Sequence, residues 1–201
     1  MQKSVLAWLI SVLGLVALAV YVGPTLLKVV PDSGPVQQGE AAIGGDFTLV
    51  DGDEKTVTNA DFKGKYMLVY FGFTHCPDIC PTTLLMMTNA LEQMGEDAKD
   101  IAPIFITLDP ERDTPKVVGA YVKNFSADLI GLTGSMAQVT RAAAAYKVYF
   151  SKVKSEDSAM GYMIDHSGFM YLMDRDGKYI THFTHTMPLQ SLVSGLRKHV
   201  L

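Results

Sequence analysis

The run Tyr66–Phe73 (YMLVYFGF) is the feature that most constrains the fold of this chain. It is almost continuously apolar and ends at a glycine-containing turn, which is typical of a central strand buried on both faces. Pro81 suits the first turn of a helix, which we predict over Thr82–Met94. Cys76 and Cys80 lie between the strand and the helix. The sequence therefore predicts a strand–turn–helix unit that carries a pair of thiols at the turn.

The other predicted elements alternate between strands and helices and end with a hairpin and a helix. In chain order they are a hairpin of Phe47–Val50 and Thr56–Thr58, a strand Ile104–Leu108, a helix Thr114–Phe125, a strand Leu129–Leu132, a helix Met136–Ala145, a strand Val148–Lys152, a hairpin of Phe169–Met173 and Tyr179–Phe183, and a helix Leu189–Val200. This order predicts an α/β fold with a mixed central sheet and helices on both faces. A reactive pair at a strand-to-helix turn of such a fold is the thioredoxin arrangement, so we expect a thioredoxin-like domain.

The N-terminal region from Ser4 to Leu27 has no charged residue and is flanked by Lys3 and Lys28. Its length exceeds the roughly 20 residues that a helix needs to cross a bilayer. We predict a transmembrane anchor over residues 4–27, a flexible tether rich in glycine and proline over 28–45, and the folded domain over 46–201. The alternative is a cleaved signal peptide, with Ala17-Leu18-Ala19 as the cleavage site. In both cases we expect the domain to lie outside the cytoplasm.

The charge and the cysteine content exclude several classes of protein. The 201 residues carry a net charge of −4 and no long basic run, so we do not expect a nucleic-acid partner. Two cysteines are too few for a disulfide-stapled scaffold. A close pair more often indicates metal binding or thiol chemistry.

The spacing of Cys76 and Cys80 suits either of these chemistries. Residues four apart lie on one face of a helix, with Cβ atoms roughly 5–6 Å apart. The positive end of the helix dipole favours thiolate over thiol. Thiolates select Cu(I), zinc or iron–sulfur iron, but two of them cannot complete a tetrahedral zinc site, so a metal would require further ligands. A stabilising disulfide and a pair of buried small residues are the plainer alternatives.

Five histidines are candidates for a further ligand. We expect His199 to lie exposed in the terminal helix, and His182 and His185 lie on or after the last strand without a sulfur neighbour in sequence. His75 adjoins Cys76, but adjacent side chains of an extended segment point to opposite faces. His166 precedes a predicted central strand, where a loop can open toward the start of the cysteine helix. The residue pattern alone leaves both a structural role and a metal-binding role open for it.

Three stretches of the chain resemble one known family in order and spacing. They are Tyr70–Pro81 (YFGFTHCPDICP), Thr107–Pro115 (TLDPERDTP), and Asp165-His166-Ser167 followed by Tyr171-Leu172 and Asp176-Gly177. They are similar to the signature of the Sco/SenC family of copper-binding proteins, and the resemblance covers about residues 43–199. We expect Asp109-Pro110 and Asp113-Thr114-Pro115 to shape a loop and begin a helix rather than to contact metal.

The resemblance implies a thioredoxin-like fold that binds one copper ion per chain, as Cu(I) or Cu(II), through Cys76, Cys80 and His166. It also implies a role in assembling the CuA centre of cytochrome c oxidase subunit II, the expected partner, and another copper chaperone is a second candidate partner. Asp78 and Asp165 become candidates for residues that orient the ligands, or else solvated turn residues. The expected location is the inner (plasma) membrane of a bacterium, in a single pass with the domain facing the periplasm.

Two functions stay open at the sequence level, and they are compatible with each other. The first is a metallochaperone that carries copper to the CuA centre. The second is a thiol–disulfide oxidoreductase that uses Cys76 and Cys80 to reduce the CuA-site cysteines. The resemblance does not favour a peroxidase, and the chain has no attached signalling domain that would indicate a copper or redox sensor.

Overall fold

The computed structural model describes residues 43–155 and 161–201. The predicted transmembrane anchor over 4–27 and most of the predicted tether over 28–45 lie outside these ranges. Within them, no helix has both the length and the apolar character needed to cross a membrane.

The elements of the described chain follow the predicted order closely. They are β1 (Thr48–Val50), β2 (Thr56–Thr58), η2 (Asn59–Phe62), β3 (Tyr66–Gly72), α2 (Ile79–Met94), η3 (Gly95–Ala98), β4 (Ile101–Thr107), α3 (Pro115–Val122), β5 (Ile130–Leu132), α4 (Met136–Ala145), β6 (Phe150–Lys154), β7 (Tyr162–His166), β8 (Phe169–Met173), β9 (Tyr179–Thr184) and α5 (Leu189–Val200). Every predicted helix and strand is confirmed, with shifts of a few residues at some ends, and β7 and the short helices η2 and η3 are additions.

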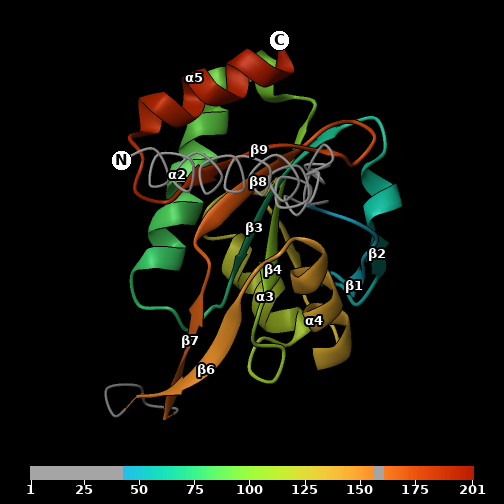
Figure 1. Cartoon of the computed structure of the whole chain (residues 1–201), viewed down its shortest axis with the longest axis vertical. Coiled ribbons are helices and arrows are strands. Elements are labelled where there is room, and N and C mark those ends of the chain that lie inside the picture. The colour runs from blue at the N-terminus through green and yellow to red at the C-terminus, as the bar shows by residue number, and fades with distance from the viewer. Residues whose placement is uncertain (1–42, 156–160) are drawn as a thin grey trace, which may run out of the picture. The chain divides into compact units, whose positions relative to one another are not determined.

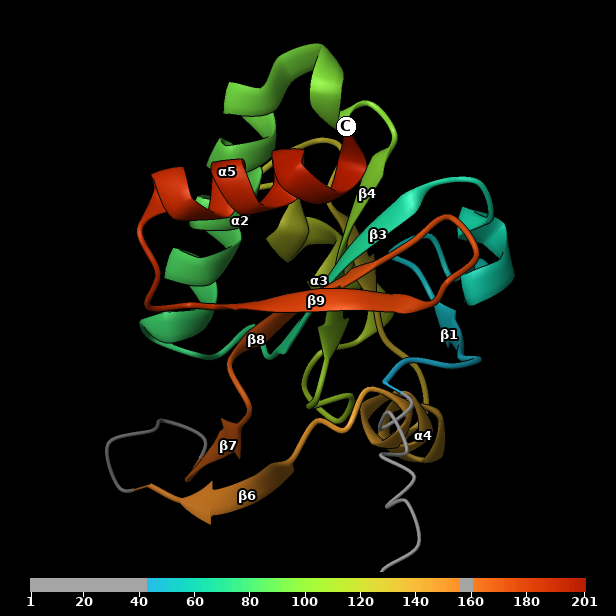
Figure 2. The same cartoon turned by 45° about the horizontal axis from the view of Figure 1, so that its top comes forward.

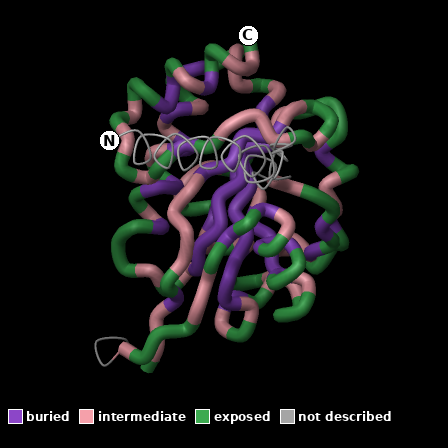
Figure 3. Tube along the Cα trace, viewed as in Figure 1, coloured by how far each residue is buried: buried purple, intermediate pink, exposed green. Residues whose placement is uncertain are grey.

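A five-stranded mixed sheet of order β5-β4-β3-β8-β9 forms the centre of the domain (Figures 1 and 2). β3 is the middle strand; it pairs parallel with β4 and antiparallel with β8. Its residues from Met67 to Gly72 are buried, which confirms the strand predicted from the apolar run. The buried trace of Figure 3 follows these central strands.

Helices cover both faces of this sheet, as predicted. Tyr70 and its register partner Phe105 lie on one face, where Tyr70 reaches α2 and the Phe105 ring lies 5.6 Å from Tyr121 of α3. On the opposite face, the Phe71 ring lies 5.3 Å from that of Tyr146, the residue that follows α4. Helix α5 packs beside α2 (Figure 2). The sheet is thus the middle layer of the domain.

The carboxyl ends of the parallel strands β3 and β4 meet at one edge of the sheet. The loop after β3 carries Cys76, and the loop after β4 carries Asp109 and Asp113. The backbone N–H of Thr74 donates to Asp113 Oδ2 at 2.9 Å, which ties the two loops together. Open α/β sheets commonly place their sites at this edge.

The strands β6 and β7 form a separate two-stranded sheet that extends from the domain (Figures 1 and 2). The sequence predicted a strand near β6 but a loop at His166, and this loop assignment is wrong. His166 is the last residue of β7 and lies opposite Phe150. The sequence of β7, YMIDH, does not alternate between apolar and polar residues, so it lacks the pattern that predicts a half-buried strand.

Candidate metal centre

Cys76 and Cys80 lie on either side of the start of α2. Cys76 is half-buried in the turn after β3, and Cys80 is fully buried in the first turn of the helix. The helix begins at Ile79, three residues before the predicted start. The backbone N–H of Cys80 donates to Cys76 Sγ at 3.4 Å, and both cysteines are free thiols. The predicted thiol pair at the strand-to-helix turn is therefore present.

The two thiols have opposite acidities. A hydrogen bond from the Cys80 thiol lowers the pKa of Cys76 to about 5, against the effect of burial, and the backbone N–H groups of Cys80, Asp78 and Ile79 lower it further. The same hydrogen bond raises the pKa of Cys80 above its ordinary value, as do burial and the negative charge of Cys76. At neutral pH Cys76 is therefore a thiolate, while Cys80 keeps its proton.

His166 joins the pair from the hairpin, although it is 86 residues away from Cys80 in the sequence. Its Nε2 lies 3.6 Å from Cys80 Sγ. Its Nδ1 lies 3.1 Å from the Ser167 carbonyl oxygen, and a carbonyl can only accept, so Nδ1 carries the hydrogen. The edge-on rings of Tyr70 and Phe73, 6.2 and 6.1 Å away, hold the imidazole from the core side. Nε2 thus keeps its lone pair on the side of the sulfur, as a metal ligand requires.

The distance between these two atoms suits a shared ion. Thiolate sulfur and imidazole nitrogen bind zinc at about 2.3 Å and about 2.0–2.1 Å, so one ion of similar size can contact two such atoms 3.6 Å apart. Among the described residues, no group of three or more His, Cys, Asp or Glu side chains forms a complete metal-binding set as it stands. The structure therefore brings Cys80 Sγ and His166 Nε2 within 3.6 Å of each other, with Cys76 hydrogen-bonded to Cys80.

Tyr70 and Gly72, both from β3, surround the Cys80 sulfur. The Tyr70 hydroxyl donates to Cys80 Sγ at 3.7 Å, and burial strongly raises the pKa of Tyr70. A Cβ at Gly72 would lie only 2.8 Å from the same sulfur. Neither residue was predicted to belong to the site, because each is part of an apolar strand, where a tyrosine or glycine gives no signal of its own.

Asp113 holds the loop that presents Cys76. Its fully buried carboxylate accepts from the Thr74 backbone N–H and from the hydroxyls of Thr74 and Thr107. His75 Nδ1 lies 3.6 Å from Asp113 Oδ1, so this imidazole is directed at the carboxylate. The prediction that this aspartate shapes a loop is confirmed.

Some of the remaining candidate residues line a cavity beside the cysteines, and others lie elsewhere. A cavity of about 270 Å³ includes Cys76, His166, Asp78 and Asp165 in its wall, together with His185, which the sequence analysis did not associate with a sulfur. Asp78 and Asp165 are exposed there. His182 lies against the Phe169 ring, with 4.8 Å between ring centroids. Only His166 among the histidines has a hydrogen-bond-range contact with a cysteine in the described chain.

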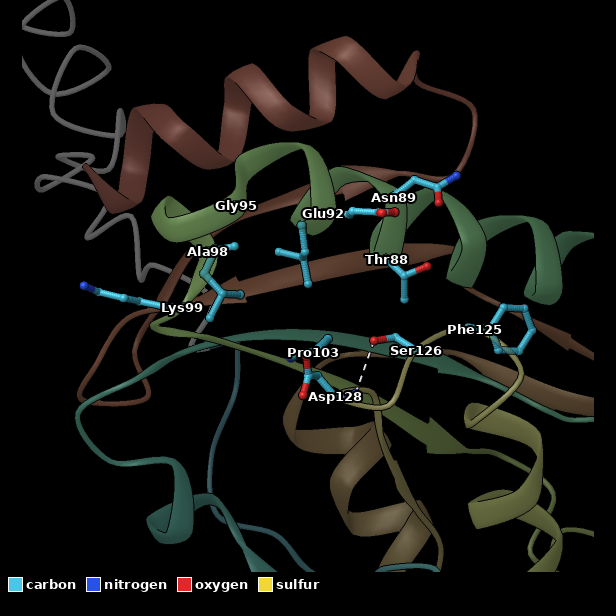
Figure 4. A pocket seen from close by; sticks show the side chains of 12 residues that line it. Thr88, Asn89, Glu92, Gly95, Ala98, Lys99, Pro103, Phe125, Ser126 and Asp128 are labelled. Carbon is cyan, nitrogen blue, oxygen red and sulfur yellow. Dashed lines mark hydrogen bonds between the residues drawn. The ribbon is translucent and has the colours of Figure 1, made fainter.

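A second, larger cavity of about 370 Å³ lies between α2, η3, the start of β4 and the loop before β5 (Figure 4). Its wall includes Glu92, Lys99 and Phe125, and the backbone N–H of Asp128 donates to Ser126 Oγ beside it. None of the candidate ligands lines this cavity, so size alone does not identify the site.

The fold and the site together define a class of protein. A mixed sheet with a thiolate–thiol pair at the start of a helix, and an imidazole brought to it from a hairpin, is a thioredoxin-like domain built for soft-metal or thiol chemistry. The sequence model of the SCO1/SenC family matches residues 35–201. The chain belongs to the SCO1/SenC family.

Several relatives share most of the described domain. The SCO2-like protein of Rickettsia felis is 45% identical over 74% of this chain and 72% of its own length. Protein SCO1 homolog 1, mitochondrial, of Arabidopsis thaliana is 44% identical over 81% of this chain, which spans about half (48%) of that relative.

Solved structures of the family have the same fold. Arabidopsis thaliana ScoI with copper bound is 44% identical, with a TM-score of 0.74 over 78% of this chain and 97% of that one. BsSco, described as a member of the Sco family of cytochrome c oxidase assembly proteins and as having a disulfide switch, is 25% identical, with a TM-score of 0.60 over 78% of this chain and 93% of that one.

Proposed function

We propose that this chain is a copper-binding assembly factor for the CuA centre of cytochrome c oxidase. It would hold one copper ion, as Cu(I) or Cu(II), through Cys76, Cys80 and His166. The observation that carries the proposal is the 3.6 Å distance between Cys80 Sγ and His166 Nε2, two soft-metal donors from distant parts of the sequence. The copper-bound structure of the plant relative and the naming of BsSco as an oxidase assembly protein support it.

The chemistry of the donors fits copper. Thiolate sulfur selects Cu(I), and imidazole suits copper in both oxidation states. Cys76 is already a thiolate at neutral pH, since its pKa lies near 5, so it needs no proton loss before it binds. The Ser167 carbonyl orients His166, as partners of metal-binding histidines usually do.

Anaerobic titration of the reduced protein with Cu(I) tests this proposal. We expect one copper per chain in the wild type and loss of tight binding in Cys76→Ala, Cys80→Ala and His166→Ala. His182→Ala is the matched control, because His182 contacts Phe169 and Tyr179 rather than sulfur, and it should bind like the wild type. Wild-type affinity in His166→Ala would contradict the ligand set.

The opposite acidities of the thiols support a second function, reduction of the disulfide formed by the two CuA-site cysteines. The Cys76 thiolate would attack this disulfide and form a mixed disulfide, and one substrate sulfur would leave and take up a proton. Cys80 would then lose its proton and attack Cys76, which gives a Cys76–Cys80 disulfide and a substrate dithiol. Two electrons pass from this chain to the substrate.

The two functions separate experimentally through His166. With an oxidised CuA domain of subunit II as the substrate, we expect His166→Ala to keep most of the reductase activity and Cys76→Ala to lose it. Cys80→Ala should accumulate the mixed disulfide, visible as a covalent complex on a non-reducing gel. No reduction by the wild type would leave copper binding as the function.

We further propose that residues 4–27 anchor the domain in the inner membrane of a bacterium, with the domain in the periplasm and subunit II as its partner there. The uncharged run of transmembrane length supports this location. Spheroplasts that express the full chain give the test, since added protease should digest the domain only when it faces outward. Protection of the domain in intact spheroplasts would contradict this topology.

A further inference from the structure

The hairpin that carries His166 has little internal means of holding its position. Strands β6 and β7 pair with each other and with no strand of the central sheet. Every described side chain of the two strands except Ile164 is half-buried or exposed. An isolated two-stranded hairpin is marginally stable at best in water. The position of the imidazole therefore depends on contacts from outside the hairpin.

Arg112, from the loop after β4, makes such a contact at the first residue of β7. Its guanidinium carbon lies 3.8 Å from the centroid of the Tyr162 ring, and its Nη1 donates to the Tyr162 carbonyl oxygen at 3.4 Å. The Arg112 side chain is only 6% exposed. A cation stacked on an aromatic face is more strongly attracted when it is desolvated, as it is here.

Asp109 holds both partners of this contact. Its fully buried carboxylate accepts a hydrogen bond from Arg112 Nε. It also accepts from the Tyr162 hydroxyl, which lies 3.0 Å from Oδ1 and 3.2 Å from Oδ2. The planar guanidinium can pair with a carboxylate and stack flat on a ring, whereas a lysine ammonium is a point charge without this planar fork. The buried Arg112 and Asp109 and the half-buried Tyr162 thus form one connected unit.

The same guanidinium also lies near Phe73, which precedes Cys76 in the chain. Its carbon lies 5.8 Å from the centroid of the Phe73 ring, and Phe73 contacts the His166 ring edge-on. Arg112 thus lies between the strand that carries His166 and the segment that leads to Cys76.

We propose that Arg112, held by Asp109, is the positioning residue that sets the place of His166 relative to the two cysteines. This inference rests on the ligand set proposed above and concerns how the third ligand is held. Lys152 also lies over the Tyr162 ring, with its Nζ 4.8 Å from the centroid, against 3.8 Å for the Arg112 guanidinium carbon. Its contribution is smaller, because the Lys152 and Glu111 side chains are 40% and 60% exposed and such contacts are largely screened by water.

The first test needs no metal and measures backbone amide hydrogen exchange in the reduced protein. In Arg112→Lys we expect the amides of residues 162–166 to exchange at least tenfold faster, with α5 unchanged. Lys154→Gln, which changes an exposed lysine of the same hairpin, is the control and should match the wild type. If Arg112→Lys does not fold, Tyr162→Phe gives a second test, because it keeps the ring and removes the hydroxyl that donates to Asp109. Unchanged exchange over 162–166 in the tested variant overturns the inference.

The second test is Cu(I) affinity, measured by competition with a chromophoric chelator. Loss of a residue that orients a metal ligand typically lowers affinity 10–100-fold, and we expect this for Arg112→Lys. Combined with His166→Ala, it should cause no further loss, since the histidine is then already absent. Additive losses in the double variant overturn the inference. Wild-type affinity in His166→Ala would refute the proposed ligand set instead, and the exchange experiment would still decide the role of Arg112.

Discussion

At the scale of single residues, the acidity of Cys76 is the property with the clearest chemical consequence. An ordinary thiol is half-ionised near pH 8.5, whereas the pKa of Cys76 is lowered to about 5, first by the Cys80 thiol. A thiol whose pKa is lowered stays ionised until the pH falls to the new value. We expect the rate of alkylation by iodoacetamide to stay level from pH 8 to about 6 and to fall only near pH 5, whereas an ordinary thiol loses about tenfold per pH unit.

Substitution of each cysteine in turn identifies the cause of the low pKa of Cys76. Cys80→Ala removes the largest contribution, so the midpoint of the alkylation profile should move to higher pH. Cys76→Ala removes the hydrogen bond and the negative charge that raise the pKa of Cys80, but Cys80 stays fully buried and should therefore react slowly. A wild-type midpoint near pH 8.5 would show that Cys76 is not a thiolate at neutral pH.

Gly72 provides a second prediction at this scale. A Cβ there would lie 2.8 Å from Cys80 Sγ and 3.0 Å from a ring carbon of Phe105, so Gly72→Ala must displace the sulfur or the ring. Overpacking of this kind costs about 1–3 kcal/mol. We expect a lower urea midpoint and weaker copper binding in the same variant. Full stability together with wild-type copper affinity would show that the sulfur has more room than the structure indicates.

At the scale of elements, Asp113 joins the ends of two parallel strands. Its carboxylate accepts from Thr74 in the loop after β3 and from Thr107 at the end of β4. Asp113→Asn replaces one accepting oxygen with a donor, and an unsatisfied buried group costs about 1–3 kcal/mol. Urea denaturation should show a lower midpoint with an unchanged slope. Asp176→Asn, in the exposed turn before β9, is the control and should change stability by less than about 0.5 kcal/mol.

The elements also show what the sequence could and could not predict. Strand β3 and helix α4 were found because their apolar residues repeat at the spacing of a buried strand and of an amphipathic helix. Strand β7 was missed because its stability comes from Arg112 and Asp109, about 50 residues away, rather than from its own pattern. For the same reason, residue patterns alone could not choose His166 over His185, and the family resemblance was needed.

At the scale of the whole domain, a metal ion held by Cys80 and His166 would link α2 to the hairpin β6–β7. These parts are otherwise connected through side-chain contacts such as those of Tyr70 and Phe73 with the imidazole. A ligand that binds only the folded state adds about 2.7 kcal/mol of stability at a free concentration of 100 times its Kd. For a domain of this size, the corresponding increase in Tm is roughly 5–10 °C.

We therefore expect buffered Cu(I) to raise the Tm of the reduced protein, and to raise it much less in Cys80→Ala and His166→Ala. Any copper bound by the cysteines of the unfolded chain lowers the increase, so the comparison between variants is more informative than the absolute shift. Differential scanning calorimetry under anaerobic conditions measures the rise in Tm. His182→Ala is the control and should behave like the wild type. An equal rise in the wild type and in His166→Ala would mean that copper binds without linking the hairpin to the helix, since the imidazole is the only proposed ligand outside the α2 region.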